Sequence, residues 1–235
     1  MMDLSDIQVC IFDVNGVLVD SNLANARAMA EAFTEDTALK ERIAALYLTL
    51  TGIDRGSKIR IIQEKIIEGP FKEGEFDLRW ETFQRLAHRS MCQAPLLPGA
   101  KEVLAEVGKR DIRRAALSNT PLGELKEILA AHDLLTLLDV VRGGGDWPKS
   151  ESLARLLDEF QFEPDRSLFF GDGKGDLAAA RHAGLSFVAI DPGVGEFDGE
   201  AGFDGPYQHL AEWGQKVLGM RDLEKPGAHP GFDQV

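Results

Sequence analysis

The sequence predicts an α/β protein with a doubly wound, Rossmann-like and mostly parallel sheet, into which an α-helical cap domain is inserted. Between residues 98 and 193, short apolar runs alternate with helical patterns, and this alternation requires parallel strands joined by right-handed crossovers. The segment 21–95 has few strand-like runs and is typical of helices alone. A chain of 235 residues with 44% hydrophobic content is long enough for a core with a smaller inserted domain.

The first strand is expected at residues 9–12, where the apolar run Val-Cys-Ile-Phe leads directly into Asp13. Ligands of open α/β sheets bind beyond the carboxyl ends of the strands, so Asp13 is the first candidate for a nucleophile. Asn15 and Gly16 follow, and an acidic residue close to Asn-Gly is also typical of an ordinary turn after a strand. This stretch alone leaves both interpretations open.

The segment after the first strand is expected to form a lid over Asp13. Helical patterns cover 22–33, 37–51, 57–68 and 76–91, with breaks at Gly52, Gly56 and Gly69-Pro70. A helical insertion that leaves and re-enters the core beyond a strand's carboxyl end is placed to close over the site. We therefore expect a core domain at 1–20 and 96–220, a cap domain at 21–95, and an extended tail at 221–235.

The rest of the core is expected to continue the alternation of strands and helices. Strands are expected at 114–117, 137–141, 167–170 and 187–190. A helix opens at Pro98-Gly99 and runs to about residue 108, and later helices are expected at 122–131, 150–160, 177–183 and 211–218. The last helix is expected to turn Trp213 toward the core, and no strand is predicted after residue 193.

Polar residues follow several of these strands and are expected to meet at one edge of the sheet. They are Asp13 with Asn15, Ser118 with Asn119, Lys149, and Asp172 with Asp176. Taken singly, each also fits a structural role as a helix cap, a turn residue or a solvated residue of a first helical turn. Their occurrence at four strand ends favours a shared site.

The residue types in this set predict phosphoryl transfer. Three carboxylates in one crevice would repel one another and raise at least one pKa unless a cation lay among them. Oxygen ligands of this kind suit Mg²⁺, and the backbone carbonyl of Asn15 is the expected further ligand. Lys149 and Ser118 would then hold a phosphoryl group, while the carboxylate of Asp13 attacks it and forms an aspartyl-phosphate.

Composition and charge exclude several other classes of protein. The net charge of −13 argues against nucleic acid as a partner, because no basic block offsets repulsion by phosphates. Cys10 and Cys92 are too few for a disulfide framework, which fits a reducing compartment. The first residues lack the pattern of a signal peptide, and no apolar run approaches the ~18 residues of a membrane helix. We expect a cytoplasmic protein with no membrane partner, either a monomer or a homodimer.

From residue 7 to about residue 193, the chain resembles the haloacid dehalogenase superfamily. The stretch 13–18 is similar to the first motif of that family, Ser118 to the second, Lys149 to the third, and Gly171-Asp172 with Asp176 to the fourth. The segment 21–95 resembles the helical cap of phosphatases of the phosphoglycolate type and of β-phosphoglucomutase.

This resemblance implies a role for each matched residue. It implies that Asp13 is the nucleophile and that Ser118 and Lys149 hold the phosphoryl group. It also implies a Mg²⁺ site formed by Asp13, the Asn15 carbonyl and Asp172, with Asp176 in support. Gly16, inside the first matched stretch, and Asn119, next to Ser118, are expected to bind substrate.

The cap segment adds one candidate residue, Arg55. The loop 51–55 resembles a cap loop that reaches into the active site, and Arg55 is similar in placement to a phosphate-binding arginine of the mutase. Phosphonate hydrolases of the family carry an imine-forming lysine near this place. Arg55 cannot form an imine, so it disfavours phosphonate cleavage. Lys58, three positions further on, is the alternative candidate for that lysine. Helical periodicity leaves open which of five cap residues face the cleft: Arg27, Tyr47, Arg55, Lys58 and Arg79.

The chain departs from the family pattern at Asn15, where hydrolytic members usually carry an aspartate that protonates the leaving alcohol and later activates water. An amide cannot exchange that proton, and general acid–base catalysis contributes ~10²–10⁴-fold. The sequence therefore predicts a slow, Mg²⁺-dependent phosphatase of a small phosphorylated metabolite. The alternatives are a binding or regulatory protein for phosphorylated ligands with little turnover, and a sugar phosphomutase. Deamidation at Asn15-Gly16 would restore the acid in part of the protein.

Overall fold

The computed structural model describes residues 4–51, 53–145 and 147–221. The strands are β1 (Val9–Phe12), β2 (Arg113–Pro121), β3 (Val140–Gly144), β4 (Ser167–Gly171), β5 (Ser186–Ile190) and β6 (Asp204–Tyr207). The helices are α1 (Asn22–Phe33), α2 (Thr37–Leu48), α3 (Arg55–Ile62), α4 (Glu75–Gln93), α5 (Ala100–Lys109), α6 (Leu122–Ala131), α7 (Lys149–Phe160), α8 (Lys174–Ala183) and α9 (Leu210–Val217). The expected break at Gly52 and the expected tail beyond residue 221 lie outside the described residues.

In the described residues, six strands form one parallel sheet in the order β3-β2-β1-β4-β5-β6. The strand β1 is buried along its whole length and pairs with β2 on one side and β4 on the other. The chain moves outward from β1 in both directions, so the carboxyl end of β1 lies at the switch point where open α/β sheets bind ligands. The predicted α/β, Rossmann-like fold class is confirmed.

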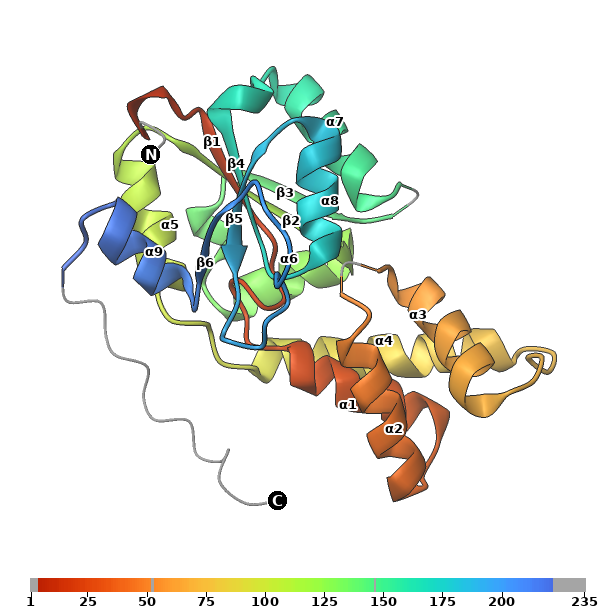
Figure 1. The fold of residues 1–235 in the computed structure, drawn as a ribbon. Helices are drawn as coiled ribbons and strands as arrows, with labels where there is room; N and C mark the ends of the chain where they lie inside the picture. The colour runs from red at the N-terminus through yellow and green to blue at the C-terminus, as the bar shows by residue number, and fades with distance from the viewer. Residues whose placement is uncertain (1–3, 52, 146, 222–235) are drawn as a thin grey trace.

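Helices cover both faces of the sheet, and alternate residues of each strand point into one layer or the other. In β1, Cys10 and Phe12 pack in the core formed with α5, α6 and α9, whereas Val9 and Ile11 pack in the core formed with α7 and α8. Figure 1 shows the two layers on either side of the strands. Burial on both faces explains why the strands are continuous apolar runs rather than alternating patterns.

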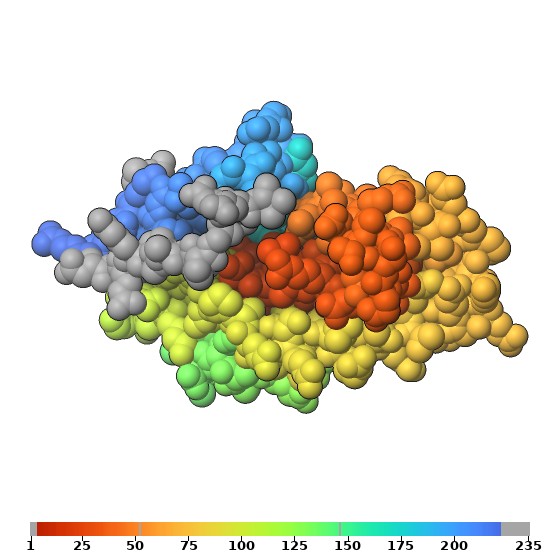
Figure 2. Space-filling model, turned by 90° about the horizontal axis from the view of Figure 1, so that it is seen from below, coloured from red at the N-terminus to blue at the C-terminus, as the bar shows by residue number. Residues whose placement is uncertain are grey.

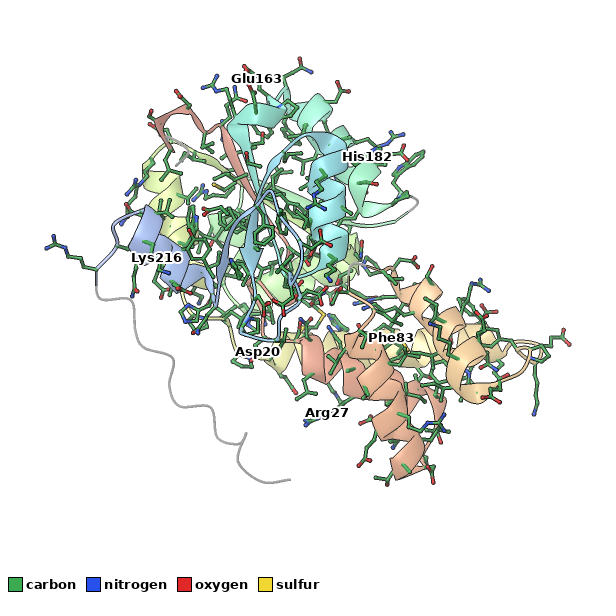
Figure 3. The ribbon with its side chains drawn as sticks, in the orientation of Figure 1. Asp20, Arg27, Phe83, Glu163, His182 and Lys216 are labelled. Atoms are coloured by element: carbon green, nitrogen blue, oxygen red, sulfur yellow. The ribbon has the colours of Figure 1, made fainter. Side chains whose placement is uncertain are left out.

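The helices α1 to α4, called the helical bundle below, pack around a separate hydrophobic core that includes Met29, Ile43, Ile59 and Phe83. Figure 1 shows the bundle at one end of the sheet, and Figure 3 shows Phe83 between its helices. Seen from below in Figure 2, the orange and yellow surface of the bundle adjoins the green and blue surface of the core. None of the helices in the described part of the chain is long and apolar enough to cross a membrane.

Several element bounds differ from those predicted. The strand β6 was not predicted, because Asp204–Tyr207 contains Gly205-Pro206 and is largely exposed, so it has no apolar run. The third strand was expected at 137–141, but Leu135–Leu137 forms a 3₁₀ turn and β3 begins at Val140. The strand β2 continues past Leu117 to Pro121, and α8 begins three residues earlier than expected, at Lys174.

The prediction that Trp213 faces the core is confirmed, and this residue anchors α9. Its side chain is 1% exposed, and its ring centroid lies 4.8 Å from that of Phe170, which stacks on Phe12 at 4.6 Å. We expect Trp213→Ala to lower the free energy of unfolding by about 3–5 kcal/mol, because truncation leaves a cavity in the core. Urea unfolding would measure this loss, with Trp147→Ala as control, since Trp147 is 48% exposed. An equal loss of unfolding free energy in both variants would contradict the role of Trp213 as the residue that anchors α9 in the core.

Candidate active site

Asp13 directly follows β1, and its position is fixed by both backbone and side-chain contacts. Its backbone N–H donates to the carbonyl of Phe170 in β4 at 2.9 Å. One carboxylate oxygen, Oδ1, accepts from the backbone N–H of Val14 at 2.7 Å. The residue is buried but lines a cavity at the end of the sheet, so this carboxylate is both held and accessible to a small ligand.

Lys149 joins Asp13 to Asp176. It is the first residue of α7, and its Nζ lies 3.0 Å from Oδ2 of Asp13 and 2.6 Å from Oδ1 of Asp176, in the first turn of α8. Burial alone would lower the pKa of Lys149, but the two carboxylates raise it above its usual range, so the ammonium is charged. The structure therefore brings together three predicted site residues from three different elements.

Asp172 completes a group of three carboxylates whose oxygens lie within 4.8 Å of one another: Asp13, Asp172 and Asp176. Its Oδ2 accepts from Nδ2 of Asn22 at 2.6 Å. Burial raises the pKa of Asp172, and repulsion by the Asp13 and Asp176 carboxylates adds to that shift. Lys149 is the ammonium in ion-pair contact with this group, and it contacts two of the three acids. An all-oxygen donor set of three carboxylates fits a hard divalent cation such as Mg²⁺.

Two glycines allow the carboxylates to lie this close to the strand-end loops. Gly16 has a φ of +78°, and a Cβ built on it would fall 1.9 Å from Oδ2 of Asp172. A Cβ on Gly171 would fall 2.4 Å from the Cβ of Asp176. Any side chain at Gly16 would displace Asp172, so the structure gives this glycine a steric role; its predicted contact with substrate stays a prediction.

Asn15 lines the same cavity, and its side chain is held by a neighbour. The hydroxyl of Ser21 donates to Oδ1 of Asn15 at 2.7 Å, and the backbone N–H of Gly16 donates to the carbonyl of Val19 at 2.9 Å. The NH₂ group of Asn15 is then the part available to a ligand. It can donate a hydrogen bond, but it cannot give up a proton as a carboxylic acid does.

The cavity has a volume of about 90 Å³ and lies between the end of the sheet and the helical bundle. Its lining from the core consists of Asp13, Asn15, Asn119, Thr120, Lys149 and Asp172. Ser118 is not part of this lining. Because β2 continues to Pro121, Ser118 lies within the strand, where it is buried and its Oγ accepts from the backbone N–H of Thr120 at 3.2 Å. Its role in holding phosphate stays a prediction.

Among the five cap residues left open by periodicity, Tyr47, Arg55 and Lys58 line the cavity. Arg27 is exposed and points away from the bundle (Figure 3). Arg79 is buried inside the bundle, where it pairs with Glu75 and donates to the carbonyl of Phe33 at 3.0 Å.

Arg55 spans the junction between the bundle and the core. Its guanidinium lies 3.0 Å from the Glu124 carboxylate of α6 and donates to Oγ1 of Thr120 at 3.3 Å. It is 7% exposed, and its Cζ lies 5.3 Å from the ring centroid of Phe83. Arg55 therefore reaches the cavity as expected, but it does so with a carboxylate partner that the sequence did not indicate.

Sequence reasoning missed two cavity residues of α1, Asn22 and Asn25. They lie one turn apart on the helix that follows the strand-end loop, and this i, i+3 spacing of two amides was the available signal. Asn25 is 3% exposed, and its Oδ1 has no hydrogen-bond partner within the described ranges. A buried amide oxygen without a partner in a cavity is positioned to accept from a ligand.

The fold and the strand-end carboxylates give an α/β protein with a candidate site at the switch point of the sheet. Residues 7–184 match the family model described as haloacid dehalogenase-like hydrolase, which covers more than half of the chain. The chain therefore belongs to the haloacid dehalogenase-like hydrolase family and is a hydrolase. The resemblance drawn from the four sequence motifs is confirmed.

Two curated relatives share about four fifths of the chain. Phosphoglycolate phosphatase of Haemophilus influenzae (strain 86-028NP) is 29% identical over 192 residues, which cover 77% of this chain and 84% of that protein. Phosphoglycolate phosphatase of Synechococcus elongatus is 27% identical over a match that covers 81% of this chain and 86% of that protein. Among solved structures, CbbY from Rhodobacter sphaeroides in complex with phosphate shares the fold, with a TM-score of 0.72 at 23% identity. The match covers 88% of this chain and 96% of that chain.

Proposed function

We propose that this hydrolase is a Mg²⁺-dependent phosphatase of a small phosphorylated metabolite. The observation that carries the proposal is the Asp13 carboxylate, which is open to the cavity and held by Lys149 beside two further carboxylates. The curated relatives support a phosphomonoester as substrate, because they carry the name phosphoglycolate phosphatase. The small volume of the cavity favours a substrate of few atoms.

In the proposed reaction, an oxygen of Asp13 attacks phosphorus and the bond from phosphorus to the substrate alcohol breaks. The leaving oxygen takes its proton from solvent, since Asn15 has none to give. Water then attacks the aspartyl-phosphate, releases inorganic phosphate and restores Asp13. Lys149 holds Asp13 in place and balances charge on the phosphoryl oxygens.

The proposed Mg²⁺ would be held by Asp13, Asp172 and the backbone carbonyl of Asn15, with Asp176 in support. When bound, it would neutralise negative charge on the phosphoryl oxygens. The donor chemistry supports this site, because burial and mutual repulsion raise the pKa values of Asp13 and Asp172 in its absence.

We further propose that the helical bundle acts as a cap whose closed position covers the substrate and limits the access of bulk water to the cavity. Two contacts from the bundle segment to the core support this. Arg55 pairs with Glu124, and the hydroxyl of Thr51 donates to the carboxylate of Glu196, in the loop after β5, at 2.6 Å. In this closed position Arg55 is placed to contact the phosphorylated substrate.

The experiment that tests the proposal is turnover of p-nitrophenyl phosphate with Mg²⁺ and with a chelator. This substrate has a good leaving group, so it bypasses the proton that Asn15 cannot supply. We expect hydrolysis that depends on Mg²⁺. Absence of turnover would favour the second candidate, a binding protein for phosphorylated ligands, which the amide at position 15 supports. A phosphomutase is less favoured, because it needs the same proton transfer in every cycle.

Removing one acid of the site should weaken cation binding. We expect Asp172→Asn to bind Mg²⁺ at least about tenfold more weakly than the unmodified protein, as measured by calorimetry without substrate. The matched control is Asp165→Asn, which removes an exposed carboxylate from the same acidic protein. Equal affinity in all three proteins would contradict the assigned site.

A further inference from the structure

Lys58 lines the cavity from the bundle side, and the mechanism proposed above does not use it. The residue lies in the first turns of α3 and is only 9% exposed. Its Nζ lies 4.0 Å from the ring centroid of Tyr47. It has no ion pair and no side-chain hydrogen bond to any residue in the ranges that the structure describes.

The other buried cations of the described ranges each have a carboxylate partner. Arg55 pairs with Glu124, Arg79 pairs with Glu75, and Lys149 pairs with Asp13 and Asp176. Burying a charge without a partner is costly, and proteins avoid it unless a ligand supplies the opposite charge. Among these buried cations, Lys58 alone has no carboxylate within ion-pair distance. Burial lowers the pKa of Lys58 to about 8, and the Asp172 and Asp13 carboxylates of the same cavity oppose that shift. These are two of the acids that would bind Mg²⁺, so a bound cation would leave Lys58 to be neutralised by a ligand.

We propose that Lys58 binds a second anionic group of the substrate, a carboxylate or a second phosphate, while the phosphoryl group to be removed lies at Asp13. This inference rests on the proposed phosphatase function. Asp13 and Lys58 line the same small cavity from the core and from the bundle, so one short molecule with an acid at each end can touch both. The expected substrate is therefore a small phosphomonoester that carries a further acid, and the phosphoglycolate in the name of the curated relatives is one such molecule.

Two neighbours support a ligand here rather than a purely structural lysine. Tyr47 offers its ring face to the ammonium, and burial raises the pKa of its hydroxyl to about 12, so the ring stays neutral and does not compete as an anion. Asn25 contributes the buried, unpartnered Oδ1 described above, an acceptor for a hydroxyl or a protonated oxygen of the same ligand. Arg55, which is proposed above to contact the substrate, carries a charge that Glu124 already balances, so it differs from Lys58 in this respect.

The test compares three substrates that differ only in the group opposite the phosphate: phosphoglycolate, ethylene glycol bisphosphate and hydroxyethyl phosphate. The unmodified protein is expected to prefer one of the two diacids over hydroxyethyl phosphate in kcat/KM by roughly 10- to 100-fold, as a charge-assisted hydrogen bond would give. A preference for phosphoglycolate would identify the group that Lys58 binds as a carboxylate, and a preference for ethylene glycol bisphosphate would identify it as a second phosphate. In Lys58→Met this ratio should fall toward one, and Lys58→Arg should restore part of it.

The matched control is Lys65→Met, which removes an exposed lysine from the helical segment Gln63–Ile67 that directly follows α3, and it should keep the preference. A ratio unchanged in Lys58→Met, or an equal loss for all three substrates, would overturn the proposal. Thermal unfolding checks that Lys58→Met is folded, and Lys58→Gln replaces it if it is not.

A different outcome would overturn the phosphatase proposal but not the Lys58 proposal: no hydrolysis of any phosphomonoester, including p-nitrophenyl phosphate. Calorimetry with the same three compounds then tests Lys58 by binding alone. A diacid preference that disappears in Lys58→Met supports the subsite, and equal affinities in both proteins overturn it.

Discussion

Replacing Asn15 by aspartate is expected to raise kcat for an alkyl phosphate by ~10²–10⁴-fold, the usual contribution of general acid–base catalysis. The new carboxyl group would lie in the cavity beside Asp13, where it can protonate the leaving alcohol and later take a proton from water. The Ser21 hydroxyl, which donates to Oδ1 of Asn15 at 2.7 Å, can donate in the same way to a carboxylate. The substitution therefore adds a proton-transfer group without removing a contact.

The leaving group decides where the gain appears. With p-nitrophenyl phosphate, the first step needs no acid, so the unmodified protein should release a rapid burst of nitrophenolate and then slow at hydrolysis of the aspartyl-phosphate. Stopped-flow absorbance would record the burst, and Asn15→Asp should convert it into steady turnover. The control is Asn15→Gln, which changes the side chain at the same position without adding an acid and should not give the gain. An Asn15→Asp variant as slow as the parent on alkyl phosphates would contradict the proposed role of position 15.

Deamidation must be measured in the same experiment, because a small fraction of protein deamidated at Asn15 would imitate basal activity of the amide form. The structure opposes the reaction: the Gly16 N–H that would attack is donated to the Val19 carbonyl, and Ser21 holds the Asn15 side chain. We expect peptide mapping of fresh protein to find the amide intact. Activity that rises with the deamidated fraction on ageing would show that the acid form carries the turnover.

The sequence was sufficient for the core of the candidate site because a parallel sheet places the carboxyl ends of its strands at one edge. Asp13 follows a strand, Asp172 follows another, and Lys149 begins the helix after a third, so their meeting needed only the order of the elements. The hydrogen-bond geometry was not predictable in this way. That Lys149 bridges Asp13 and Asp176 depends on side-chain lengths and on the close approach that Gly171 allows.

The bundle side of the cavity could not be predicted, because tertiary packing decides which residues of a short helix face a cleft. Arg55, Lys58 and Arg79 are all buried cations, yet Arg79 turns inside the bundle toward Phe33, whereas the other two reach the cavity. Hydrophobic periodicity carries little information here, since α3 is a short helix that bears arginine and lysine among its few apolar residues. The strand β6 was not predicted from the sequence either, because it lies at the edge of the sheet and lacks an apolar run.

The same geometry makes Asp13 the residue whose loss should matter most. We expect Asp13→Asn to reduce kcat by at least about 10³-fold, because an amide oxygen is a poor nucleophile and no second carboxylate can take its place without moving. Asp176 is already paired with Lys149, and Asp172 is held by Asn22. Mg²⁺-dependent release of phosphate, measured beside Asp165→Asn as a control for loss of a carboxylate, would show the difference.

Loss of activity in Asp13→Asn must be separated from loss of fold. The amide has nearly the same shape and removes one of three mutually repelling carboxylates, while Lys149 keeps Asp176 as a partner. Thermal unfolding of the variant should therefore occur at or above the temperature of the parent. Acid quenching of the unmodified protein during turnover should leave a phosphoryl group on the peptide that contains Asp13, and the variant should show none. A folded variant that still forms a phosphorylated enzyme would assign the nucleophile to another residue. The carboxyl end of β1 would then not be the site of phosphoryl transfer.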